Sequence, residues 1–141
     1  MVTAPFPTEQ VADLQFEQLV ELLCQRPGMF VSPVTFGAVC AYLNGFDAAR
    51  SHGPLIGLHP WLVVRANDGN NWTWTGLARS LLPGGLECPE EQAIRELGSL
   101  LAEFFEYRRS QGITKVFQEY ARWLLRRPWY TGPLRRARRD V

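Results

Sequence analysis

The sequence has no long hydrophobic run, and this excludes a membrane-spanning chain. No stretch approaches the roughly 18 consecutive apolar residues that a transmembrane helix needs. The first residues also lack the basic segment and the apolar segment of a secretory signal. We therefore expect a cytoplasmic protein without a membrane partner.

Cysteine is scarce, and its spacing excludes the usual cysteine chemistry. Cys24, Cys40 and Cys88 fit neither a zinc ligand pair nor a Cys-x-x-Cys redox pair. Two of them stand beside apolar positions of expected helices, where a thiol behaves as a small hydrophobic group. We expect all three to be buried, reduced and inert.

Catalytic motifs are absent as well. The chain contains no G-x-S-x-G, no glycine-rich phosphate loop, no H-E-x-x-H and no EF-hand spacing. His52 and His59 fall in expected turns, where a histidine usually faces solvent. The acidic group Glu87–Glu96 is explained by its place at a helix start. We therefore predict no catalytic residue, metal or cofactor. The one alternative in which the chain is an enzyme has its site at His59, near Trp61.

The composition is that of one globular domain with a core. The chain has 141 residues, of which 46% are hydrophobic and 12% aromatic, and domains commonly hold about 100–200 residues. Its charged fraction and spread of apolar residues exclude a disordered, coiled-coil or collagen-like chain. We expect a flexible lead over 1–7, a single helical domain over 8–130 and a basic flexible tail over 131–141.

Apolar residues recur at spacings of three and four along most of the chain, which predicts amphipathic helices. The first three expected segments run from Asp13 to Arg26 with Thr8 or Asp13 as cap, from Ser32 as cap with Pro33 in the first turn to Arg50 or Ser51, and over Leu58–Ala66. The third segment is also compatible with a short strand, so a two-stranded ribbon at 61–74 stays open.

Three more helices are expected in the second half. The first is capped by Asn70 or Asn71 and carries Trp74 to Leu81, the second runs from Pro89 to the break at Gly112, and the third runs from Thr114 to Arg127. The last should bury Val116, Phe117, Tyr120, Ala121 and Leu124. The pattern as a whole predicts an all-α, compact bundle of about five to six helices.

Three tryptophans lie close together in the sequence around a turn. Trp61, Trp72 and Trp74 flank the asparagine-rich segment 67–71. We expect Trp61 and Trp74 to fill the core, because large aromatics stabilise small helical domains. Trp72 stands beside polar asparagines, and we expect it to be exposed and available to a partner.

Charge is divided unevenly between the two parts of the chain. Residues 1–106 hold five arginines against twelve acidic residues, a net charge of −7, whereas residues 107–141 have a net charge of +8. The C-terminal segment also alternates arginine with aromatic residues. The candidate partner-binding residues are Trp72, Arg122, Arg126, Arg127, Trp129, Tyr130, Arg135 and Arg136.

This basic segment can bind an acidic protein, its own acidic body, or phosphates. We favour docking on protein, because the acidic body would repel phosphates that approach alongside it. The alternative is a nucleic-acid-binding accessory protein, in which arginines neutralise phosphates and aromatic rings stack on bases. The pattern does not decide whether the chain forms a homo-oligomer.

The turn after the first expected helix has a distinctive sequence. In the segment 26–30, Arg26 stands near the negative end of the helix dipole, Pro27 prevents continuation, and Gly28 is free to adopt a positive φ. Met29 and Phe30 are expected to fold back as an apolar plug. The alternative makes Arg26 a cation that faces a ligand.

Several segments in this order resemble a group of small, mostly uncharacterised bacterial proteins. The resemblance covers about residues 13–106 and consists of Cys24–Phe30, Phe36, Leu43, Gly45-Phe46, Ala48-Ala49, Gly57-Leu58, Trp61-Leu62-Val63, Trp72 or Trp74, and Glu91–Phe105. Some members of that group are associated with immunity genes beside toxin genes. The resemblance implies a non-catalytic role of immunity or regulatory type and no catalytic residues. The arginine-rich extension after Tyr107 departs from the pattern.

Overall fold

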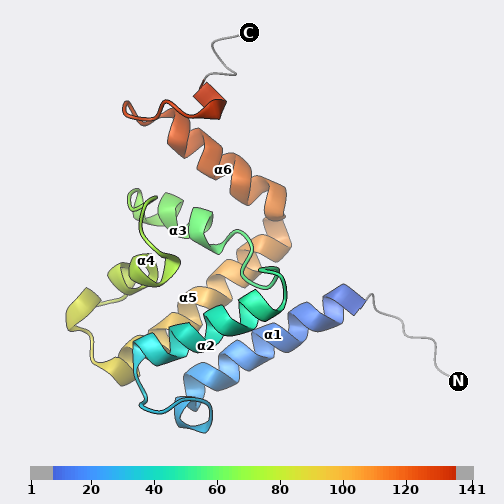
Figure 1. The fold of residues 1–141 in the computed structure, drawn as a ribbon, viewed down its shortest axis with the longest axis vertical. Helices are drawn as coiled ribbons and strands as arrows, with labels where there is room; N and C mark the ends of the chain where they lie inside the picture. The colour runs from blue at the N-terminus through green and yellow to red at the C-terminus, as the bar shows by residue number, and fades with distance from the viewer. Residues whose placement is uncertain (1–7, 136–141) are drawn as a thin grey trace, which may run out of the picture.

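The chain is built from helices alone across the part that the structure describes. The computed structural model describes residues 8–135, with side chains from residue 15 onward, and contains no strand there (Figure 1). The expected all-α fold is confirmed, and the alternative ribbon at 61–74 is wrong. No helix within this range is long and apolar enough to cross a membrane.

Six α-helices and two short 3₁₀ helices follow one another between residues 8 and 125, and residues 133–135 are helical as well. Their bounds are α1 (Thr8–Gln25), η1 (Pro27–Met29), α2 (Phe36–Ala49), α3 (Leu58–Ala66), α4 (Trp74–Leu81), η2 (Gly85–Glu87), α5 (Glu90–Gln111) and α6 (Ile113–Leu125). The expected bounds of α3 and the expected break after α5 are confirmed. The last helix ends two residues earlier than expected.

Helix α5 is the axis of the fold. Helix α1 lies along it, α2 and α4 pack beside it, and α3 packs mainly on α4 and α6 (Figure 1). The buried apolar stripe of α5 provides much of the core. Its members are Ala93, Ile94, Leu97, Leu100, Leu101, Phe104 and Phe105. Because α6 continues directly from α5 through Gly112, α6 extends the molecule at the end opposite the start of α5 (Figure 1).

Three helix starts differ from the expected ones. Helix α1 begins at Thr8, so the expected start at Asp13 lies inside the helix. Helix α2 begins after Thr35, whose hydroxyl accepts a hydrogen bond from the Ala38 N–H at 3.1 Å, so Ser32 is not its cap. Helix α4 begins after Thr73, which accepts from the Gly76 N–H at 3.2 Å and replaces the expected asparagines. Threonine caps act in the same way as the expected residues, by satisfying an amide that has no partner in the first turn.

The turn after α1 also forms differently from the expectation. Pro27–Met29 is a 3₁₀ turn in which Gly28 does not adopt a positive φ. Met29 is 67% exposed and therefore is not a plug, whereas Phe30 is half-buried and packs edge-on against Tyr42. Arg26 is exposed. The segment 26–30 thus ends α1, as expected, but it does so through a 3₁₀ turn and not through a glycine with positive φ.

Candidate functional site

The loop after α3 is tied to the C-terminal end of α6 by one side chain. Asn67 lies at the end of α3 in the left-handed region, with φ 56°. Its Oδ1 accepts hydrogen bonds from the indole N–H of Trp123 and from Nη2 of Arg127, both at 2.8 Å. The loop 67–73, which carries Trp72, is therefore fixed against α6.

Aromatic rings continue from this junction along α6 and beyond it. Trp123 is buried, stacks on Tyr120 with ring centres 6.2 Å apart, and meets Trp129 edge-on at 6.3 Å. The guanidinium of Arg127 lies over the Trp123 ring, 4.3 Å from its centre, in a cation–π contact. Trp123 is thus a core residue. The expectation that Phe117 belongs to the core is wrong, because it is 43% exposed and the packed side of α6 includes Trp123 instead.

The candidate arginines divide into two groups. Arg127 and Arg135 bind their own chain: Arg127 donates to Asn67, and Nη2 of Arg135 donates to the carbonyls of Leu125 at 2.5 Å and Arg127 at 2.9 Å. The Leu125 carbonyl ends α6, where a cation is favoured by the helix dipole. Arg136 lies outside the described residues.

The second group consists of exposed cations on α6 and at its C-terminal cap. Lys115, Arg122 and Arg126 are exposed, and over residues 15–135 none of them forms an ion pair. Two acidic residues belong to this end of the molecule. Glu119 accepts from the Tyr107 hydroxyl at 2.6 Å, and Asp68 accepts from the Gly69 N–H at 2.7 Å. Burial, followed by the bond to Glu119, raises the pKa of Tyr107 to about 12.

Two tryptophans are half-exposed at this end. Trp72 is 52% exposed and Trp129 is 56% exposed, whereas Trp61 is buried and Trp74 is half-buried. The expected burial of Trp61 and exposure of Trp72 are therefore confirmed, whereas Trp74, expected in the core, packs against it only partly buried. Tyr130 packs against the core. We call Lys115, Arg122, Arg126, Trp72 and Trp129 together the α6-end surface.

Both histidines were expected in turns, but only His52 lies in one. His52 is exposed in the turn after α2, 3.3 Å from the buried carboxylate of Asp47. His59 lies in the first turn of α3, where its Nε2 is 2.9 Å from the carbonyl oxygen of Trp72. Across the described part of the chain, no three acidic, histidine or cysteine residues are grouped as a metal site would require.

Exposed acidic side chains also lie at the other end of α5. Glu87 and Glu91 are exposed at its start, beside Glu90, which accepts the Phe36 N–H and lies 3.8 Å from Arg79. Helix α5 is about 33 Å long at 1.5 Å per residue. This distance exceeds the Debye length of about 8–10 Å at physiological salt. Arg127 and Arg135 contact a side-chain amide and main-chain carbonyls. These two arginines therefore do not bind acidic groups of the body, as had been expected.

The cysteines are buried and unpaired, as expected. Burial raises the pKa of both the Cys24 and the Cys40 thiols to about 12. A thiolate is the reactive form of cysteine. At neutral pH these two residues are therefore neutral thiols inside the helix packing.

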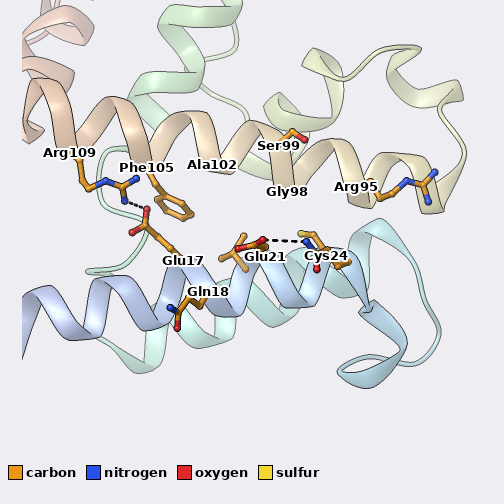
Figure 2. A pocket seen from close by; sticks show the side chains of 12 residues that line it. Glu17, Gln18, Glu21, Cys24, Arg95, Gly98, Ser99, Ala102, Phe105 and Arg109 are labelled. Carbon is orange, nitrogen blue, oxygen red and sulfur yellow. Dashed lines mark hydrogen bonds and ion pairs between the residues drawn. The ribbon is translucent and has the colours of Figure 1, made fainter.

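A groove of about 630 Å³ runs between α1 and α5 (Figure 2). Small and apolar residues form its floor, and a salt bridge between Glu17 and Arg109 closes one end (Figure 2). Arg109 also binds Glu106 at 2.9 Å. Glu21 is hydrogen-bonded to Gln25 at 3.3 Å. Cys24 lines the groove as well, and burial raises the pKa of its thiol to about 12, which leaves it protonated at neutral pH.

Sequence reasoning missed Asn67 and Lys115 as parts of the α6 end. A signal for Asn67 was present, because an asparagine before Asp-Gly readily adopts the left-handed region. The signal for Lys115 is its spacing of seven and eleven residues from Arg122 and Arg126. No family model, curated protein or solved structure matches this chain.

Proposed function

We propose that this chain is a non-catalytic protein that acts in the cytoplasm by docking on an acidic partner protein through the α6-end surface. The observation that carries the proposal is a set of three exposed cations, on α6 and at its C-terminal cap, that form no ion pair within residues 15–135. The half-exposed Trp129 follows the same helix end, and the half-exposed Trp72 lies in the loop that Asn67 ties to it. A role of immunity or regulatory type belongs to this proposal and rests on the sequence resemblance alone.

Physical considerations favour this kind of partner. Tryptophan and arginine are the residues most enriched among energetically dominant interface residues, and charge complementarity accelerates association. Trp129 is held edge-on by Trp123, so little conformational freedom remains to be lost when a partner binds.

The alternative, binding to nucleic acid, rests on the same cations. The main objection to this alternative is that the acidic body would repel phosphates. This objection weakens, because the exposed carboxylates at the start of α5 are farther from α6 than the Debye length. The experiment must therefore distinguish the two classes of partner directly.

The test measures binding to an acidic protein and to nucleic acid side by side. A succinylated, highly acidic model protein and single-stranded and duplex oligonucleotides are titrated at two salt concentrations against the intact chain and the Arg122→Glu/Arg126→Glu variant. We expect binding to the acidic protein that the variant loses. Tighter binding to an oligonucleotide, with a steep salt dependence lost in the variant, would replace the proposal by the alternative.

A further inference from the structure

A second groove, of about 560 Å³, runs between α2 and α4. Both helices pack on α5 rather than on each other, so a hollow remains between them. Along α2 its lining extends from Phe36 to Asn44, which is about 12 Å at 1.5 Å per residue. Pockets that bind small molecules commonly have volumes of about 300–1,000 Å³. The α2–α4 groove is therefore large enough for a small molecule.

Two glycines keep this groove open. Apart from the backbone of its own helix, a Cβ added to Gly37 would meet no atom within 4 Å, and one added to Gly76 would meet only the Thr73 hydroxyl oxygen, at 3.5 Å. Neither glycine has a positive φ, and neither allows a close approach of two helices. Glycine stabilises a helix less than alanine does. Backbone geometry and packing therefore do not explain these two glycines, whereas space in the groove does.

Arg79 brings a buried cation to the groove. It is 9% exposed, and its guanidinium lies over the Phe36 ring, 4.8 Å from the ring centre. Its Nε and Nη2 donate to main-chain carbonyls of the turn 85–88, with the shortest bond, 2.7 Å, to Cys88. Within residues 15–135, Nη1 forms no hydrogen bond, and no fully buried side-chain nitrogen lacks a partner. Nη1 is therefore not fully buried and is the part of Arg79 left to the groove.

Glu90 places a carboxylate beside this nitrogen. Its Oε2 accepts the Phe36 N–H at 2.6 Å and lies 3.8 Å from Nη1 of Arg79, which is too long for a hydrogen bond. Its Oε1 forms no hydrogen bond within the described residues, and the side chain is 51% exposed. Among the residues that line the groove, only these two are charged. One end of the groove thus offers an unused N–H donor and an unused carboxylate oxygen close together.

The lining beyond this charged pair is mainly apolar. Its apolar members are Phe36, Cys40, Ala41 and Leu86. At the far end, Oδ1 of Asn44 accepts the Trp74 indole N–H at 2.7 Å, which fixes the orientation of the Asn44 amide. A ligand that fits this lining has both charges at one end and an apolar body.

We infer that the α2–α4 groove binds a free α-amino acid with an apolar side chain, as its zwitterion. The carboxylate accepts from Nη1 of Arg79, and the ammonium donates to Oε1 of Glu90. The side chain lies along α2, on Phe36 and Ala41. This site is separate from the α6-end surface, and the inference does not depend on the proposed function.

The balance of charge favours a zwitterion over an anion or a cation. An α-amino acid has its two charged groups on one carbon atom and matches Arg79 and Glu90 together. A simple carboxylate would be repelled by Glu90, and a simple amine by Arg79. Hydrogen bonds between charged groups are also stronger than those between neutral groups. Inside a peptide chain the two charges are far apart, so a peptide does not satisfy both residues.

Ligands of matched shape test the inference. L-Phenylalanine, L-leucine and L-methionine are each compared with the analogue that lacks the ammonium and the analogue that lacks the carboxylate. For L-phenylalanine these analogues are hydrocinnamate and phenethylamine. Each ligand is titrated into the isotope-labelled intact chain at neutral pH. Changes in the NMR amide signals of Gly37, Asn44 and Thr75 locate the binding site.

Three variants accompany the ligands. Gly37→Leu fills the groove, and Gly45→Leu is its matched control, because Gly45 is an exposed glycine of the same helix that does not line the groove. Glu90→Gln removes the negative charge but keeps an oxygen that can accept the Phe36 N–H. Arg79 is left unchanged, because its other nitrogens hold the turn 85–88. Circular dichroism confirms that each variant folds.

We expect saturable binding of the amino acid at the groove, at least about tenfold tighter than that of either analogue, which corresponds to about 1.4 kcal/mol. Gly37→Leu should abolish this binding, and Gly45→Leu should not. Glu90→Gln should weaken the amino acid about tenfold without weakening the carboxylate analogue.

Three results would overturn the inference. The first is the absence of saturable binding by all three amino acids. The second is equal binding of an amino acid and either of its analogues, which indicates recognition of a single charge. The third is binding that persists in Gly37→Leu or that Glu90→Gln leaves unchanged.

Discussion

Asn67 is the residue on which the geometry of the α6 end depends most directly. Its side-chain oxygen satisfies the indole N–H of the buried Trp123 and the guanidinium of Arg127. It does so from a left-handed backbone conformation that asparagine tolerates better than most residues. One amide therefore sets the positions of both the loop 67–73 and the end of α6.

Replacing this amide should destabilise the fold. Asn67→Gly keeps the backbone conformation accessible but leaves the Trp123 N–H without its acceptor, at a cost of about 1–3 kcal/mol in the free energy of unfolding. Urea denaturation measures the loss. Asn71→Gly, at an exposed position of the same loop, controls for the added flexibility of glycine. Equal unfolding midpoints for the two variants would contradict this role of Asn67.

Two buried thiols should make the free energy of unfolding depend on pH. The pKa of Cys24 and of Cys40 is raised from about 9 to about 12 in the folded chain. Below pH 9 both states hold the proton, so these thiols do not change stability there. Between pH 9 and 12 the unfolded chain loses protons that the folded chain keeps, so the free energy of unfolding should fall.

Thiol titration and denaturation check this behaviour. We expect Cys24 and Cys40 not to react with a thiol reagent at pH 7.5 in the folded chain and to react at once in guanidinium chloride. Cys24→Ser/Cys40→Ser should flatten the decline of the unfolding free energy above pH 9. A decline of the same slope in that variant would show that other groups cause it.

At the scale of elements, the start of α2 illustrates why a helix boundary is hard to predict locally. Ser32, with Pro33 after it, is a good local start signal, yet Thr35 caps the helix. A carboxylate oxygen of Glu90, at the start of α5, accepts the Phe36 N–H at 2.6 Å. The Phe36 amide, at the first position of this helix, is thus satisfied by a residue far away in the sequence.

A matched pair of variants tests this cap. Thr35→Ala should lower the free energy of unfolding by about 1 kcal/mol, because it removes the acceptor of the Ala38 N–H. Ser32→Ala should have little effect. The two unfolding curves are compared at the same pH, and the reverse order of effects would restore Ser32 as the cap.

Other elements could be predicted because their boundaries are set locally. The break after α5 follows from Gly112, which adopts φ 86°, and Leu58–Ala66 follows from its apolar spacing. In the candidate site, the exposure of Trp72 could be predicted from its polar neighbours. The contacts of Arg127 and Arg135 could not, because a distant amide and main-chain carbonyls are not marked in the sequence.

At the scale of the whole molecule, a net charge near zero conceals a separation of charge. The exposed cations of α6 and the exposed carboxylates at the start of α5 lie at opposite ends of a helix about 33 Å long. The two ends therefore present different surfaces to partners. The arrangement supports a directed docking of an acidic protein on one end.

Site-specific photo-crosslinking in cells tests this account most directly. A photoreactive amino acid replaces Trp129 at the α6 end or, as a control, Leu86, which is 84% exposed before α5. We predict one acidic protein crosslinked from position 129, not from position 86, and lost in the Arg122→Glu/Arg126→Glu background. Crosslinks to nucleic acid from position 129, or the same protein captured from position 86, would contradict the account.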